Sequence, residues 1–241
     1  MTHLLVRTVR LALEQAADPA KAPQMQAYMK SAMPYRGVSS AKLKWLCRDA
    51  FKAHPLDSFT EWRRVAEDLW RTASFREERY AAILLTDDRR YASFRTFATV
   101  PLFEEMIVTG AWWDFVDVIS THHLGDVLRT EPRRMKSLMR RWASDKDMWK
   151  RRAAILCQIR FKQNTDLDLL YACIEPNLSH RSTRTQSGSL MASEFFIRKA
   201  IGWALRQYAW TDPKEVRRYV KEHKESLSPL SVREAMKNIA R

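Results

Sequence analysis

The chain has 241 residues, of which 46% are hydrophobic, and only 5 glycines and 9 prolines, so it is expected to form a compact fold. This length exceeds one typical small domain but does not require a second hydrophobic core. The formal net charge of +14 argues against self-association and favours a polyanionic partner, such as nucleic acid or an anionic membrane surface.

Export and membrane insertion find little support in the sequence. No apolar run reaches the roughly 20 residues that a spanning helix needs. Near the N-terminus, Arg7, Arg10 and Glu14 interrupt the apolar stripe, so no signal-peptide core is found. The three scattered cysteines lie in apolar helical patterns, which is typical of buried thiols in a reducing compartment. We therefore expect a soluble intracellular, cytoplasmic protein.

Apolar residues recur at i, i+3, i+4 and i+7 along nearly the whole chain, which is the period of an amphipathic helix. Ser58 with Glu61, and Ser74 with Glu77, match the capping box that begins many helices. The pattern predicts helices, in chain order, near residues 5–13, 25–29, 40–51, 59–73, 75–84, 101–106, 110–120, 132–142, 146–161, 167–174, 194–208, 213–223 and 231–240.

Signals for β-strands are nearly absent, since the chain has no sustained period-2 alternation and no Asn-Gly or Asp-Gly turn. The predicted fold class is therefore all-α. Short helices with short connectors favour an α-solenoid of antiparallel helical pairs. The chain shows no clean repeat period, so a globular helical bundle remains the alternative. We expect one domain over residues 1–241, with an exposed basic loop at residues 176–190, a segment rich in Ser, Thr and Arg.

The segment GAWWDFVD at residues 110–117 places two tryptophans beside two acids. On a helix, Trp113 and Asp117 lie one turn apart on the same face, and Asp114 is also a neighbour of Asp117. Trp112 is predicted to point elsewhere, into the core. Taken alone, the segment also fits two core tryptophans and an acid paired with an arginine.

Two basic segments supply further candidate binding residues. The first, at residues 147–162, leaves Arg151, Arg152 and Lys162 available beside an apolar face. The second, at residues 194–209, places Lys199, Trp203 and Arg206 on one helix face. A stripe of cations around an indole suits a phosphate backbone with a sugar or base surface. A solvated basic face with a half-buried tryptophan is the alternative interpretation.

The motifs WWDFVD, MWKRRAAI and EFFIRKAIGWALR, in this order in a basic helical chain, resemble those of the AlkD-like DNA alkylation repair glycosylases. The resemblance spans nearly the whole chain and implies HEAT-like repeats with a concave basic DNA-binding surface. It implies that Asp117, Trp113 and Trp203 are active-site residues. It further implies that Arg152 and Tyr28 contact DNA, beside the stripe formed by the second basic segment. The loop at residues 176–190 looks longer than the usual connector of the family.

The resemblance gives these residue types a chemical purpose. A purine alkylated at N3 or N7 carries positive charge and is a good leaving group, so it needs little acid catalysis. A carboxylate such as Asp117 stabilises the oxocarbenium-like sugar and helps to orient water. Indole faces of Trp113 and Trp203 attract the cation, and the guanidinium of Arg152 is expected to anchor a phosphate. We expect a monofunctional, monomeric glycosylase acting on duplex DNA with alkylated bases.

Other functions remain open at this point. A non-catalytic helical module that binds distorted or branched DNA would share the basic charge, and a protein-binding scaffold is more distant. Adjacent residues His122 and His123 diverge on a helix and lack a third ligand, so no metal is expected. No nucleotide-binding motif is present, and no cofactor is expected. Lys42, Lys44 and Arg48 form either a DNA-facing surface or a solvated face.

Overall fold

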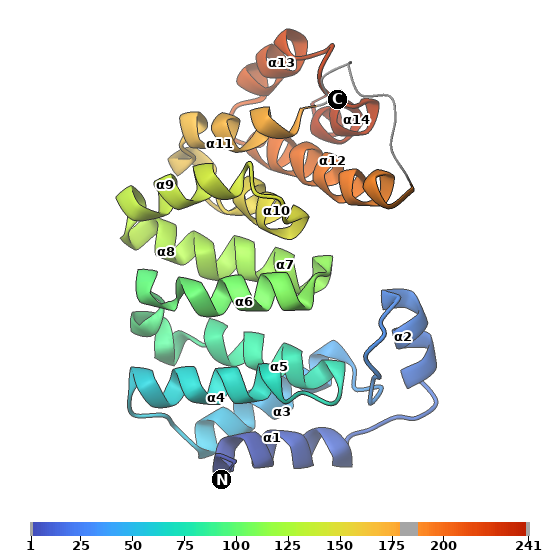
Figure 1. Cartoon of the computed structure of the whole chain (residues 1–241), viewed down its shortest axis with the longest axis vertical. Helices are drawn as coiled ribbons and strands as arrows, with labels where there is room; N and C mark the ends of the chain where they lie inside the picture. The colour runs from blue at the N-terminus through green and yellow to red at the C-terminus, as the bar shows by residue number, and fades with distance from the viewer. Residues whose placement is uncertain (1, 179–187, 240–241) are drawn as a thin grey trace. The chain divides into compact units, whose positions relative to one another are not determined.

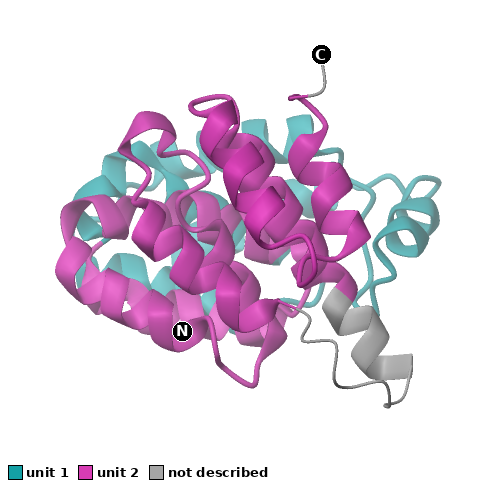
Figure 2. Cartoon of the chain, turned by 90° about the horizontal axis from the view of Figure 1, so that it is seen from above, with its two compact units in different colours: residues 1–95 teal, residues 96–241 magenta. Residues whose placement is uncertain are grey.

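The computed structural model describes residues 2–178 and 188–239, with the backbone alone for residues 188–194. Every regular element in these ranges is a helix (Figure 1), which confirms the predicted all-α class. The chain divides into two compact units, unit 1 at Met1–Arg95 and unit 2 at Thr96–Arg241 (Figure 2). The single-domain assignment stays a prediction, because helical repeats can continue from one compact unit into the next.

Unit 1 consists of helices that pair along their apolar faces. In it α1 packs on α3, α3 packs on α5, and α4 packs on both α1 and α5. Trp62 and Trp70 of α4 are fully buried in this core. The serine cap predicted for α4 is present, since Ser58 Oγ accepts a hydrogen bond from the Glu61 N–H at 3.2 Å. The elements are α1 (Leu4–Gln15), α2 (Ala22–Met29), α3 (Ser40–Ala53), α4 (Phe59–Arg71), α5 (Arg76–Asp87) and the 3-10 helix η1 (Arg89–Phe94).

The second predicted capping box, at the start of α5, is wrong. Phe75 is the N-cap of α5 and makes no side-chain cap hydrogen bond. The fully buried carboxylate of Glu77 instead accepts backbone N–H groups of residues 36–38, at 3.0–3.2 Å. Gly37 in this segment has φ +84°, and an added Cβ would lie 2.1 Å from the Asp18 carbonyl oxygen. A long-range contact of this kind is invisible to a local sequence motif.

Unit 2 is organised around α10. This helix contacts α6, α7, α9, α11 and α12, and α12 packs in turn on α14. Because neighbours surround it, α10 buries six of its nine side chains, Arg152 among them. The elements are η2 (Phe97–Thr99), α6 (Val100–Gly110), α7 (Trp113–Val118), the π-helix η3 (Ile119–Leu124), α8 (Gly125–Thr130), α9 (Pro132–Trp142), α10 (Met148–Leu156), η4 (Lys162–Asn164), α11 (Leu167–Ile174), η5 (Glu175–Asn177), α12 (Gly188–Tyr208), α13 (Pro213–Glu222) and α14 (Pro229–Met236).

The predicted loop at residues 176–190 overlaps helical elements at both of its ends. Helix α12 begins at Gly188 and not near residue 194, and η5 extends to Asn177. Residues 179–187 lie outside the described residues. The low apolar content of residues 188–190 hid the first turn of α12 from a pattern that depends on apolar spacing.

Two absences hold for the described part of the chain. No helix there is long and apolar enough to cross a membrane. No group of three or more His, Cys, Asp or Glu side chains there is arranged to hold a metal ion. The three cysteines are buried free thiols, as predicted.

Candidate active site

The chain changes direction sharply just before α7. Ala111 ends α6 in the left-handed conformation with φ +43°, and Trp112 is the extended N-cap of α7. Helix α7 then widens into the π-helix η3, in which the Thr121 hydroxyl donates to the Asp117 carbonyl at 2.8 Å. Widened turns of this type are frequent at functional sites. Here the widening begins at Ile119, two residues after Asp117.

Asp117 is held by a buried arginine of the neighbouring helix. Arg152 Nε donates to Asp117 Oδ1 at 2.7 Å, and Arg152 Nη2 donates to Oδ2 at 2.8 Å. Arg152 Nη1 donates to the Phe196 carbonyl at 2.6 Å. The side chains of Arg152 and Asp117 are 6% and 17% exposed. This bidentate pair therefore fixes the carboxylate and joins α7, α10 and α12.

Burial and ion pairing have opposite effects on the pKa of Asp117. Burial raises the pKa of the Asp117 carboxyl above its ordinary value, while the Arg152 guanidinium lowers it and the nearby Asp114 raises it. Burial is the larger effect, so the pKa is raised overall. A carboxylate whose negative charge is poorly solvated by water interacts more strongly with a cation brought into the same site.

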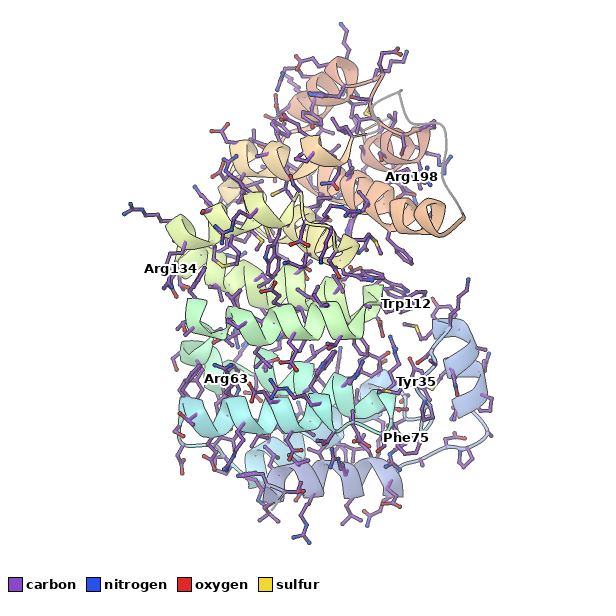
Figure 3. The ribbon with its side chains drawn as sticks, in the orientation of Figure 1. Tyr35, Arg63, Phe75, Trp112, Arg134 and Arg198 are labelled. Atoms are coloured by element: carbon purple, nitrogen blue, oxygen red, sulfur yellow. The ribbon has the colours of Figure 1, made fainter. Side chains whose placement is uncertain are left out.

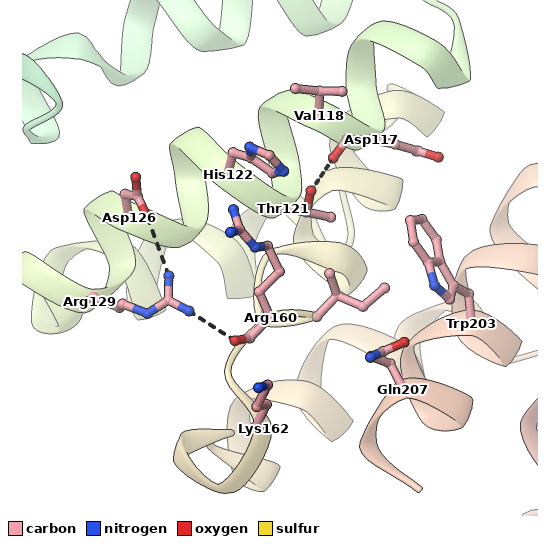
Figure 4. Close-up of a pocket in the computed structure, with 11 residues that line it drawn as sticks. Asp117, Val118, Thr121, His122, Asp126, Arg129, Arg160, Lys162, Trp203 and Gln207 are labelled. Carbon is pink, nitrogen blue, oxygen red and sulfur yellow. Dashed lines mark hydrogen bonds and ion pairs between the residues drawn. The ribbon is translucent and has the colours of Figure 1, made fainter. Parts of the chain in front are cut away.

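Asp117 and Trp203 meet at one pocket of about 690 Å³ in unit 2. In Figure 4, Asp117 extends from α7 and Trp203 stands across the pocket on α12. The rest of the lining is mostly polar or cationic, and includes Thr121, His122, Asp126, Arg129, Arg160, Lys162 and Gln207. The structure therefore brings together two of the three predicted catalytic residues.

The two tryptophans of the opening motif occupy different surroundings. Trp113 is the half-buried first residue of α7, one turn before Asp117, and it does not line the pocket. Trp112, at the start of α7 (Figure 3), packs against Trp149 and Phe196, with ring centroids 6.2 and 5.5 Å away. Trp112 was predicted to point into the core; it is half-buried and packs in this aromatic cluster. It supports the helix junction that carries Arg152.

Arg152 has other partners than the prediction assumed. We expected its guanidinium to anchor a DNA phosphate. In the structure, three of its N–H groups are already donated within the protein. A phosphate would have to compete with the Asp117 carboxylate, so holding that carboxylate is the role that the geometry supports. Local sequence patterns could not reveal this pair, because 35 residues separate its members.

Lys199 and Arg206 share one acidic partner. Lys199 Nζ lies 3.1 Å from Glu234 Oε1, and Arg206 Nη1 lies 2.6 Å from Oε2. Glu234 belongs to α14, which approaches α12 closely at Gly202, where an added Cβ would lie 2.6 Å from the Glu234 Cβ. The predicted stripe of cations around Trp203 is thus partly neutralised. Glu234 was not among the residues predicted from sequence.

Other cations stand on the far side of the pocket from Trp203. Arg129 donates to the Arg160 carbonyl at 3.1 Å and lies 4.0 Å from the centroid of the Phe161 ring. The side chains of Arg160 and Lys162 are exposed, and neither has a partner among the described residues. Figure 4 shows Arg129, Arg160 and Lys162 together at this end of the pocket. These cations are better placed than Arg152 to meet a phosphate.

The remaining predicted residues lie elsewhere. Tyr28 belongs to α2 of unit 1 and is 76% exposed, so its proposed contact with DNA stays a prediction. His122 lines the pocket, whereas His123 is fully buried with its ring 4.9 Å from that of Phe103. The two histidines diverge, as expected for adjacent residues of a helix.

Comparisons with known sequences and structures bear on the family of this chain. A family model described as DNA alkylation repair enzyme matches residues 9–239, a range that contains every residue of the pocket. No curated protein sequence matches the chain. Among solved structures, the chain is similar to one described as "Predicted DNA alkylation repair enzyme from Enterococcus faecalis", with a TM-score of 0.78 and 29% sequence identity. The similarity covers 93% of this chain and 97% of that chain, and it confirms the predicted solenoid-type fold class. The chain belongs to the DNA alkylation repair enzyme family.

Proposed function

We propose that this protein is a monofunctional DNA glycosylase that hydrolyses the N-glycosidic bond of cationic N3- or N7-alkylated purines in duplex DNA. The observation that carries the proposal is the Asp117 carboxylate, fixed by Arg152 in the wall of a pocket that Trp203 faces. A buried acid opposite an indole is suited to a cationic sugar or base. A module that only binds DNA has no need of it.

The proposed reaction requires mainly electrostatic stabilisation from the protein. A cationic alkylpurine leaves with its bonding electron pair as a neutral base, and positive charge develops on the deoxyribose. Asp117 stabilises this charge and orients the water that attacks C1′. The attacking water loses a proton once it has bonded to C1′. The Trp203 indole adds a cation–π interaction of up to about 2 kcal/mol when it is desolvated. Trp113, one turn before Asp117 on α7 and outside the pocket lining, would contribute at the edge of the site.

The pocket cations have a separate task in this mechanism. Arg160 and Lys162 are exposed and unpaired among the described residues, so they are free to bind the phosphates on either side of the lesion. Lys199 is not placed to attack the sugar as an amine, because its Nζ lies 3.1 Å from Glu234 Oε1 and it does not line the pocket. This supports hydrolysis without a covalent lysine intermediate.

Base release from defined duplexes tests the proposal. We expect the protein to liberate free base from duplexes carrying N7-methylguanine or N3-methyladenine, and none from the unmodified duplex. Borohydride should trap no covalent protein–DNA adduct. A stable adduct would refute the monofunctional mechanism. If both lesions are bound and no base is released, a non-catalytic module for distorted DNA becomes the better account.

Acidification should slow base release through Asp117. The reaction needs the ionised carboxylate, and burial raises the pKa of that group. Asp117 should therefore become protonated at a higher pH than an ordinary aspartate, whose pKa is about 3.9. The rate should therefore be constant near neutrality and fall as the pH drops through the raised pKa. Single-turnover rates between pH 4 and 8, corrected for spontaneous depurination, check this. A rate that is flat over this range would show that Asp117 does not act as the anion.

A further inference from the structure

A second cationic hollow lies in unit 1, apart from the residues of the catalytic pocket. Lys44, Arg48 and Lys52 of α3 line it together with Arg89 at the start of η1, and its volume is about 740 Å³. We call it the α3 groove. Part of its floor is apolar, since Phe51 of α3 is buried there. The proposed reaction makes no use of this groove.

The cations of the α3 groove are available to a ligand. All four are exposed, and none has an ion-pair or hydrogen-bond partner among the residues that the structure describes. Unpaired cations gathered in one hollow repel each other, and a bound anion relieves that repulsion. The sequence alone left Lys44 and Arg48 open between a DNA-facing surface and a solvated face, and their place in a hollow favours the first.

The acids of the groove do not neutralise these cations. Asp88 is engaged by Arg90, whose Nε and Nη2 lie 3.0 and 2.6 Å from its two carboxylate oxygens. Arg90 is itself fixed, because its Nη1 donates to the Phe51 carbonyl at 2.8 Å. Asp87 also lines the groove and has interactions of its own within the protein. The local charge of the groove therefore stays positive.

The spacing of the α3 cations matches a nucleic-acid backbone. Lys44, Arg48 and Lys52 follow each other at i, i+4 and i+8, so they lie along one face of α3 over about 12 Å. Successive phosphates of one DNA strand advance about 3.4 Å along the duplex axis. The row of cations thus spans about three phosphate steps of one strand. A single small anion would engage only part of it.

We propose that the α3 groove binds the phosphodiester backbone of undamaged duplex DNA. It would supply salt-dependent affinity, while the pocket of unit 2 performs the chemistry. The inference rests on the proposed function in one respect, namely that duplex DNA is the substrate. Contacts to phosphates position a protein without reading the bases, so the groove should bind damaged and undamaged duplex equally well.

A charge-matched pair of variants tests the groove. The groove variant is Lys44→Gln, Arg48→Gln and Lys52→Gln together. The control variant is Lys214→Gln, Lys221→Gln and Lys224→Gln, which removes three exposed cations of unit 2, also unpaired among the described residues. Both variants lower the net charge by the same amount. Circular dichroism melting establishes that each variant is folded.

Binding is measured on an undamaged fluorescent duplex over a range of salt concentrations. The slope of log K against log salt should become shallower by about 0.9 for each phosphate that the protein no longer neutralises, so by up to about 2.7 in the groove variant. The control variant should keep the wild-type slope. Equal slopes in the two variants would overturn the proposal. Displacement of the duplex by equimolar pyrophosphate, at constant ionic strength, would instead identify a small-phosphate site and also overturn it.

The groove and the proposed reaction can fail independently. The binding measurement needs no base release, so it tests the groove even if the protein has no glycosylase activity. In single-turnover reactions, the groove variant should require a higher protein concentration for half-maximal rate, by the same factor as its loss of affinity. If the groove variant releases base with the same dependence on protein concentration as the wild type, the groove proposal is refuted and the proposed function still stands.

Discussion

Replacing Asp117 by asparagine is expected to slow base release from an N7-methylguanine duplex by roughly 100- to 1,000-fold, the usual loss for one electrostatic stabiliser of a transition state. Asparagine keeps the size of the side chain and one acceptor oxygen for Arg152, but it removes the negative charge. The Asp117 side chain is largely buried where it lines the pocket. Its interaction with the developing sugar cation is therefore weakly screened, and its loss is costly.

The matched control for this variant is Asp114→Asn. Asp114 lies three residues before Asp117 on α7, and its change removes the same charge without altering the pocket lining. Single-turnover release should stay within a few-fold of wild type in the control. Both variants should bind undamaged duplex with near wild-type affinity. A similar loss of activity in both would mean that general charge, and not the placed carboxylate, governs the reaction.

Replacing Arg152 by methionine is expected to cost about 3–5 kcal/mol of folding free energy at neutral pH, because it leaves a buried carboxylate without its partner. For a protein of this size, the melting temperature should fall by roughly 6–20 °C. The loss should shrink on acidification, since protonation of Asp117 removes the unpaired charge. Arg151→Met is the matched control, because the guanidinium of Arg151 donates to the backbone carbonyls of Asp145 and Lys146 and not to a buried acid.

The same substitution should also reduce base release. Without the guanidinium, the pKa of Asp117 rises further in the direction that burial already gives it. The acid limb of the pH–rate profile should therefore move to higher pH in Arg152→Met. The double variant Arg152→Met with Asp117→Asn should recover part of the lost stability. Strictly additive losses in this cycle would show that the pair is not coupled.

Local sequence features predicted most of the helices, since amphipathic periodicity is a property of a few neighbouring residues, although α8 was not among the predicted helices. The spacing of Trp113 and Asp117, and the position of Trp203 within its motif, could likewise be read from one helix at a time. The start of α12 at Gly188 could not, because its first turn lacks the apolar pattern that marks the rest of the helix.

The contacts between helices account for what could not be predicted from the sequence. The pairing of Asp117 with Arg152, and that of Glu234 with Lys199 and Arg206, depend on which helices pack together. A prediction from the number of charged residues alone assumes that each arginine is available to bind a phosphate. In the folded protein, some cations are already engaged by buried or partly buried acids. Arg160 and Lys162 became candidates only once the pocket that they line was known.

The proposed mechanism depends on a positive charge on the base, which together with Asp117 makes the glycosidic bond labile in this pocket. The most direct measurement compares base release from two duplexes that differ only in the lesion, N7-methylguanine or O6-methylguanine. Both lesions carry one methyl group on the same base, but only the first is cationic. We predict release of N7-methylguanine alone. Release of O6-methylguanine at a comparable rate, or no release of N7-methylguanine, would contradict this mechanism.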